Sequence, residues 1–189
     1  MDLETLYFSH ADPWRGWLEQ YHEQRSGVYL IFYKIDHPKP SMRWEEAVQE
    51  ALCFGWIDST VKSLGGGKRQ QYFCPRKPGS AWSRVNKRYI AKLEQAGRMH
   101  PSGLARVQEA RQDGSWTALD GVENGDIPPD LLAAFKPYPE ALAFFQSLSR
   151  TYMKSYLYWL FQAKRQQTRD KRIGEIIACC RAGQKSRNP

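Results

Sequence analysis

The stretch from Gly55 to Asn86 carries the side chains of this sequence that are best suited to holding a ligand. It reads GWIDSTVKSLGGGKRQQYFCPRKPGSAWSRVN and combines two tryptophans and a carboxylate with many cations around glycine and proline turns. A guanidinium can bind a phosphate or carboxylate through two parallel hydrogen bonds, and an indole face can stack on a sugar, a base or a cation. The candidate ligand-binding residues in this stretch are Trp56, Asp58, Arg69, Arg76, Trp82, Ser83 and Asn86.

The spacing of these residues predicts that several lie close together. Trp56 and Asp58 are two residues apart on a predicted strand, so their side chains share one side of the sheet. Arg69 or Gln71, both on the predicted returning strand, can approach them if the hairpin is symmetric about its glycines. Ser83 and Asn86 lie at a predicted helix start, where free backbone N–H groups favour an anion. The stretch therefore predicts a site for an anionic ligand.

Each of these residues also has a structural interpretation that the sequence leaves open. Trp56 and Trp82 could pack in the core, and Asp58 could pair with an arginine of the neighbouring strand. Ser83 could serve only as a helix N-cap, and Asn86 could satisfy buried backbone groups. If Asp58 is partly buried and free of an arginine, it is the candidate general acid or base. The sequence suggests no Cys–His or Ser–His pair.

A second group of cations lies in the sequence AKRQQTRDKRI, around a predicted break between the last two helices. Its candidate ligand-binding residues are Lys164, Arg165 and Arg169. Thr168 is predicted to cap the last helix, whose N-terminus would then complete an anion cleft from the other half of the chain. The alternative is a solvated basic helix face.

The net charge of +8 alternates along the chain. Residues 1–61 carry −5, residues 62–98 carry +9, residues 99–149 carry −4 and residues 150–189 carry +8. The basic segments could neutralise the acidic ones in the fold or form a positive cleft that concentrates anions. Nucleic acid is not a favoured partner, because no reading module is recognisable and only the short tail RAGQKSRNP resembles a basic arm.

Composition narrows the class of protein further. A chain of 189 residues with 41% hydrophobic residues can bury one core. The N-terminal sequence is acidic and no apolar run approaches the length of a bilayer span, so we expect a cytoplasmic protein without a transmembrane segment. The four cysteines form no CxxC pair and the four histidines are scattered. We therefore expect no metal site and no cofactor.

The hydrophobic pattern predicts an α+β fold with a small antiparallel sheet. A strand is expected at 27–35 and a hairpin at 56–76, whose turn contains three glycines. The sheet-containing part extends over about 1–98 and a helical part over about 99–183, within one domain; residues 184–189 form a tail that we expect to be flexible. Asp12, Ser41 and either Ser80 or Ser83 are predicted to cap the earlier helices, and residues 113–130 are predicted to form a surface loop.

Five sequence blocks resemble one family in the same order. They are EALCFGWIDS, FCPRKPGSAWSRVN, AGRMHPSGL, FFQSLSRTYMKSYLYWL and AKRQQTRDKRI. They are similar to the YdeI/OmpD-associated proteins, small bacterial proteins often labelled bacteriocin-protection proteins, and the resemblance extends from about Phe8 to Gly183. It implies a link to envelope stress or antimicrobial-peptide resistance and to an outer-membrane porin. It supplies no catalytic residues.

Three functions remain open at this point. The first is a binding protein for an anionic small molecule in a basic, Trp-lined cleft. The second is an adaptor that docks on a protein or an anionic lipid through its C-terminal basic face. The third is an enzyme that acts on a similar ligand with Asp58 as general acid or base.

Overall fold

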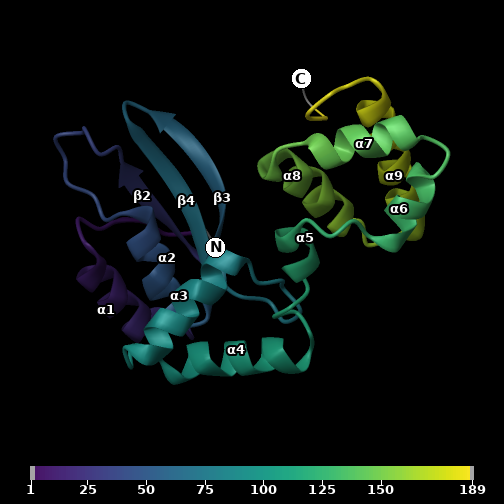
Figure 1. Cartoon of the computed structure of the whole chain (residues 1–189). Coiled ribbons are helices and arrows are strands. Elements are labelled where there is room, and N and C mark those ends of the chain that lie inside the picture. The colour runs from purple at the N-terminus through teal and green to yellow at the C-terminus, as the bar shows by residue number, and fades with distance from the viewer. Residues whose placement is uncertain (1–2, 188–189) are drawn as a thin grey trace. The chain divides into compact units, whose positions relative to one another are not determined.

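The computed structural model describes residues 3–187 and confirms the α+β fold (Figure 1). The chain divides into two compact units, with the boundary between Thr117 and Ala118. The first unit contains β1 (Thr5–Tyr7), α1 (Ala11–Tyr21), β2 (Val28–Tyr33), α2 (Trp44–Cys53), β3 (Trp56–Gly65), β4 (Lys68–Pro75), α3 (Arg84–Gln95) and α4 (Pro101–Gln112). The second contains α5 (Asp120–Asn124), α6 (Pro129–Phe135), α7 (Pro139–Ser147), α8 (Arg150–Phe161) and α9 (Gln166–Arg181). Of the expected flexible tail, residues 188–189 lie outside the described part.

The described residues of the first unit form a four-stranded sheet in the order β1-β2-β4-β3. β2 pairs antiparallel with β4, and β4 pairs antiparallel with β3. The turn between β3 and β4 contains Gly65, Gly66 and Gly67, all with positive φ, which glycine adopts without steric cost. The predicted strand and hairpin are therefore present. β1 was not predicted; it has three residues and pairs parallel with β2.

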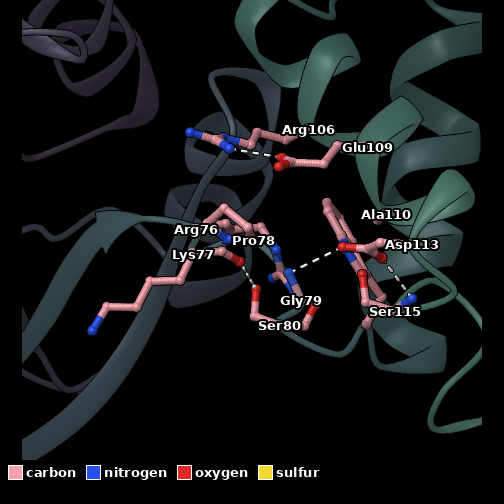
Figure 2. A pocket seen from close by; sticks show the side chains of 11 residues that line it. Arg76, Lys77, Pro78, Gly79, Ser80, Arg106, Glu109, Ala110, Asp113 and Ser115 are labelled. Carbon is pink, nitrogen blue, oxygen red and sulfur yellow. Dashed lines mark hydrogen bonds and ion pairs between the residues drawn. The ribbon is translucent and has the colours of Figure 1, made fainter.

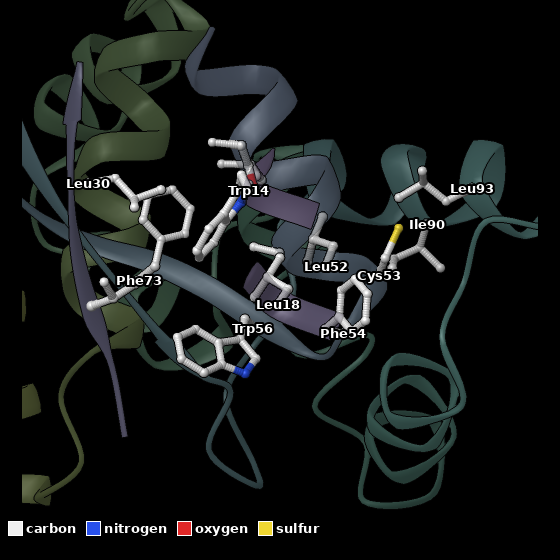
Figure 3. Close-up of a cluster of buried hydrophobic side chains, with 14 of the residues drawn as sticks. Trp14, Leu18, Leu30, Leu52, Cys53, Phe54, Trp56, Phe73, Ile90 and Leu93 are labelled. Atoms are coloured by element: carbon white, nitrogen blue, oxygen red, sulfur yellow. The ribbon is translucent and has the colours of Figure 1, made fainter. Parts of the chain in front are cut away.

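The two faces of this sheet differ in burial. Val28, Leu30 and Phe32 of β2 are buried, and the residues between them are partly exposed. Phe73 of β4 lies opposite Val28 and is also buried. Helices α1, α2 and α3 lie on this side of the sheet (Figure 1), which we call the helix face. Its core is shown in Figure 3 and includes the fully buried Trp14 of α1.

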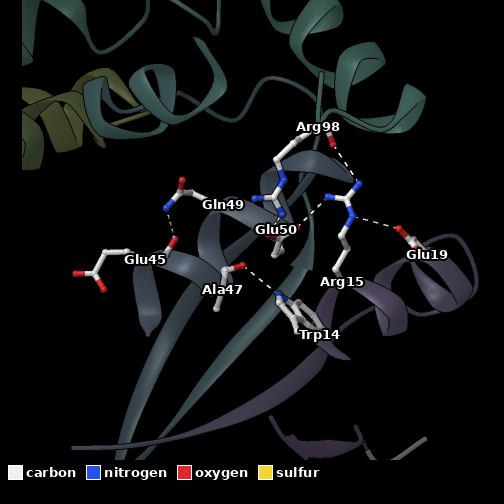
Figure 4. Close-up of polar contacts among 8 residues, drawn as sticks. All are labelled: Trp14, Arg15, Glu19, Glu45, Ala47, Gln49, Glu50 and Arg98. Carbon is white, nitrogen blue, oxygen red and sulfur yellow. Dashed lines mark hydrogen bonds and ion pairs between the residues drawn. The ribbon is translucent and has the colours of Figure 1, made fainter. Parts of the chain in front are cut away.

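A buried carboxylate ties the helices of this unit together (Figure 4). Glu50 of α2 is 3% exposed and accepts hydrogen bonds from two guanidinium groups. Arg15 Nη1 of α1 lies 2.9 Å from Glu50 Oε2, and Arg98, which follows α3, pairs with Oε1. Arg15 Nη2 also donates to the backbone oxygen of Arg98. Because three segments meet at one carboxylate, Glu50 fixes how α1 and the end of α3 are placed on α2.

The second unit has its own hydrophobic core. Leu131, Phe145, Tyr156 and Ile176, from four different helices, are buried in it. Polar contacts hold its periphery, including ion pairs between Lys154 and Glu123 and between Arg169 and Asp130. No helix within residues 3–187 is both long and apolar enough to cross a membrane.

Three predicted helix caps are wrong. α1 has His10 rather than Asp12 as N-cap, and α2 follows Arg43, because the hydroxyl of Ser41 is used to accept a hydrogen bond from the backbone N–H of Tyr33. α9 begins two residues before Thr168, where a hydrogen bond between the side chains of Gln166 and Asp170 supports its first turn.

Two further local predictions have clear outcomes. Ser83 is the N-cap of α3, as predicted, and its hydroxyl accepts a hydrogen bond from the backbone N–H of Asn86 at 3.2 Å. The segment predicted to be a loop contains the short helix α5, which ends at Gly125 with a φ of 87°. Glycine at that position can adopt the left-handed conformation that terminates a helix.

Candidate functional site

Arg76, the central cation of the predicted site, is buried after the hairpin. It is 4% exposed, its Cζ lies 3.7 Å from the ring centroid of Trp82, and its Nη2 donates to the backbone oxygens of Ala81 at 2.9 Å and Ser80 at 3.3 Å. Burial lowers the pKa of Arg76 to about 10, while the charge of Asp58 acts in the opposite direction. Its Nε is buried without a hydrogen-bond partner. The guanidinium therefore joins the loop of residues 77–81 to Trp82.

The space beside Arg76 is small (Figure 2). The cavity measures about 10 Å³, close to the volume needed for one water molecule. One wall is Asp113, whose carboxylate accepts from the backbone N–H groups of Gly79 at 3.1 Å and Ser115 at 2.8 Å. Trp82 is 1% exposed and packs on Trp116, with ring centroids 5.1 Å apart. A phosphate group does not fit this cavity without rearrangement of its walls.

Trp56 and Asp58 lie on the helix face, on the same side of β3 as predicted. Trp56 is 1% exposed, and its indole N–H donates to the backbone oxygen of His22 at 3.1 Å. Asp58 is partly buried, and its Oδ2 accepts hydrogen bonds from Trp44 Nε1 at 3.0 Å and from Gln71 Nε2. The neighbouring strand thus provides Asp58 with a glutamine and not with an arginine. The carboxylate fixes the orientation of the Trp44 indole.

The three predicted cations of the second unit have different surroundings. Lys164 and Arg165 are exposed, and Arg165 is the N-cap residue of α9. Arg169 is partly buried in an ion pair with Asp130 of α6, which lowers the pKa of Asp130 through the hydrogen bond from the guanidinium. These residues share one short segment of the second unit.

A second cavity, much larger than the one beside Arg76, is a groove of the first unit that is lined mainly from the helix face. It measures about 910 Å³ and lies between the hairpin and the connection from β2 to α2. Its apolar lining comes from Phe32, Met42, Trp44 and Val61. Its charged lining comes from Lys34, Arg43, Lys68 and Arg69 and from Asp36 and Glu45. Cations therefore outnumber acids two to one in what we call the hairpin groove.

Contacts within the hairpin groove place aromatic side chains beside the cations. The Cζ of Arg69 lies 5.5 Å from the ring centroid of Phe32, its cross-strand partner. Trp44, at the first position of α2, donates its indole N–H to Asp58 of β3. A groove of this volume, with an apolar lining and a few charged groups, has the properties of a small-molecule site.

Of the residues predicted from sequence, Arg69 lines the groove directly and Asp58 supports it through Trp44. Sequence reasoning missed Lys34, Arg43 and Trp44. A signal was available, since these residues border the loop HPKPS that follows the apolar strand. Within residues 3–187, no three His, Cys, Asp or Glu side chains gather as metal ligands.

Comparison with known families assigns a different family model to each unit. Residues 6–106 match a model described as a domain of unknown function (DUF8412), and residues 124–183 match the model for bacteriocin-protection, YdeI or OmpD-associated proteins. Three of the five sequence blocks that suggested the latter family lie within the first match, and two lie within the second. No match was found among curated proteins or among solved structures.

Proposed function

We propose that this chain, which belongs to the bacteriocin-protection (YdeI or OmpD-associated) family and carries a DUF8412 domain, is a binding protein for a small anionic ligand. The observation that carries the proposal is the hairpin groove, with its volume of about 910 Å³ and its excess of cations over acids. The site differs in position from the cleft that the sequence suggested around Arg76, and it includes Arg69 from among the predicted ligand-binding residues.

The lining of the groove narrows the class of ligand. Arg69 can bind a phosphate or carboxylate through its planar guanidinium, and Lys34 and Arg43 add positive charge nearby. Phe32 and Trp44 supply aromatic surface that excludes water from one side of the ligand. A nucleotide, or another phosphate or carboxylate compound with a ring or alkyl part, has both of the required features.

We assign no reaction to the groove. Both protein donors to Asp58 converge on the same oxygen, Oδ2, and one of them is the indole that lines the groove. We therefore propose that Asp58 positions Trp44.

A second candidate function uses the second unit as a docking surface, as in the adaptor hypothesis. Tyr158 and Phe161 of α8 are exposed and stack with ring centroids 6.4 Å apart, close in sequence to Lys164 and Arg165. Aromatic and basic side chains together suit the interface of an anionic bilayer. Co-sedimentation with anionic and with zwitterionic vesicles tests this: equal binding to both, or to neither, would exclude it.

A thermal-shift screen tests the groove. The full chain would be heated with nucleotides, sugar phosphates and simple anions. A ligand present at about 100 times its dissociation constant stabilises the native state by about 2.7 kcal/mol. Arg69→Ala and Trp44→Phe should each reduce that shift. Lys164→Ala, which removes an exposed cation from the second unit, should leave it unchanged.

The screen can also contradict the proposal in two ways. A shift that survives Arg69→Ala and Trp44→Phe would place the ligand elsewhere. If no compound in the screen stabilises the protein, the hairpin groove is not a site for a small anion.

A further inference from the structure

The face of the sheet opposite the helices carries a row of aromatic side chains, and we call it the open face. Cross-strand partners share a face, so Tyr29 of β2 and its partner Tyr72 of β4 both point to this side, as do Ile31 and its partner Gln70. Tyr33, the last residue of β2, also points to this side. All five residues are partly exposed. They alternate with the buried residues of the helix face.

These tyrosines are not used to build either core. The two hydrophobic clusters of the described residues do not include Tyr29, Tyr33 or Tyr72. Within the first unit the helices lie on the other side of the sheet (Figure 1). Aromatic side chains that the first unit does not need for packing are available for a partner.

The aromatic rings are grouped on the central strands of the sheet. The ring centroids of Tyr29 and Tyr72 are 5.2 Å apart. A second group lies alongside, where Tyr33 is 5.5 Å from Tyr7 of β1 and Lys39 Nζ lies 4.0 Å from the ring centroid of Tyr7. The open face therefore presents adjacent rings with a cation at one edge.

The strand residues on the open face carry charge of one sign. The strands that the structure describes contain a single acidic residue, Asp58, and it points to the helix face. Lys62 and Lys68, by contrast, lie opposite Gln70 and Tyr33, on the open face. Together with Lys39 they make this surface positive, which matches a polyanion.

We infer that the open face is a binding platform for single-stranded nucleic acid. Sheets that bind single strands stack successive bases on aromatic side chains of adjacent strands and contact the phosphates with nearby cations. Tyr29 and Tyr72 are the stacking residues, and Lys62, Lys68 and Lys39 contact the backbone phosphates. The sequence did not favour nucleic acid because the tyrosines are far apart along the chain and match no reading motif. The platform shares Lys68 with the lining of the hairpin groove, but its stacking residues Tyr29 and Tyr72 lie outside that lining.

Fluorescence anisotropy with the full chain tests the platform. The probes are labelled twelve-nucleotide oligo(dT) and oligo(rU), which separate a DNA from an RNA preference. Tyr29→Leu and Tyr72→Leu keep apolar bulk on the strands and remove the ring, so each should weaken binding about tenfold. Tyr72→Phe keeps the ring and should bind within about twofold of the native protein. Lys62→Ala should reduce the slope of log affinity against log salt by about 0.7.

A control variant separates this surface from other cations. Lys164→Ala removes an exposed cation from the second unit and should not change the affinity for the oligonucleotides. If neither oligonucleotide binds at low salt, the inference is wrong. Binding that is unaffected by the tyrosine variants but weakened by Lys164→Ala would locate a purely electrostatic contact on the second unit and would also overturn it.

Discussion

Replacing Arg76 distinguishes a structural role from a ligand-binding one. The side chain is 4% exposed, stacks on Trp82 and donates to two backbone oxygens of the following loop. Arg76→Ala removes the guanidinium and the apolar stem together. Arg76→Met removes the guanidinium and retains much of the stem, so the pair separates the contribution of the charge from that of packing.

The loss of stability expected on replacing Arg76 is the difference between favourable and unfavourable contributions of its side chain to folding. Two hydrogen bonds from a charged donor and a desolvated cation–π contact favour the native state by about 4–6 kcal/mol in total. Burial opposes this, because lowering the pKa of Arg76 to about 10 corresponds to about 3 kcal/mol against the charged form. The guanidinium then contributes a net of about 1–3 kcal/mol. Loss of the stem and the resulting cavity adds about 2 kcal/mol, so we expect Arg76→Met to cost about 1–3 kcal/mol and Arg76→Ala about 3–5 kcal/mol.

Urea unfolding of the three proteins, followed by tryptophan fluorescence, measures these differences. The pH dependence has a defined sign. Because the pKa of Arg76 is lower in the folded state, the unfolded state binds more protons above about pH 10, and stability contributed by this group rises with pH there. The native protein should therefore gain stability relative to Arg76→Met between pH 9 and about pH 11.

The reasoning would be refuted if Arg76→Ala unfolded with the stability of the native protein. It would also be refuted if Arg76→Met cost as much as Arg76→Ala, since the retained stem would then contribute nothing. If Arg76→Ala kept the stability of the native protein but lost affinity for a small anion, Arg76 would instead belong to the ligand-binding site that the sequence suggested.

Two further predictions concern packing and the buried ion cluster. Glu50→Gln should lower the free energy of unfolding, measured by urea titration, by about 2 kcal/mol. This loss is smaller than for a fully buried ion pair, because the side chains of Arg15 and Arg98 are 26% and 47% exposed and can be solvated. Gly103→Ala should destabilise the protein by more than about 2 kcal/mol, since the added Cβ would lie 2.1 Å from the backbone oxygen of Cys53. Gly174→Ala, in α9 with open space around it, is the matched control and should stabilise the protein by about 0.5–1 kcal/mol. Equal effects of the two glycine substitutions would contradict the close packing of α4.

Local sequence signals were sufficient for most elements of secondary structure. The apolar run of β2 and the three glycines between β3 and β4 specify a strand and a turn by conformational preference alone. Ser83 was one of two candidate caps, and a cap can be predicted locally because its hydroxyl acts within one helical turn. The wrong prediction for Ser41 has a long-range cause, since its hydroxyl accepts from Tyr33, eight residues earlier.

Sequence also indicated an α+β fold, strongly basic segments and a resemblance to the bacteriocin-protection family, whose model matches residues 124–183. Only the tertiary structure decided which cations are exposed and so available to a ligand. Arg76 is buried because Trp82 and the loop of residues 77–81 close around it, whereas Arg69, seven residues earlier on the same hairpin, lines an open groove. Whether a side chain is buried depends on the elements that pack over it, and that packing is set by residues distant in the chain. Packing also explains why Asp58 is hydrogen-bonded to Trp44 on the helix face, while the tyrosines of the open face remain partly exposed.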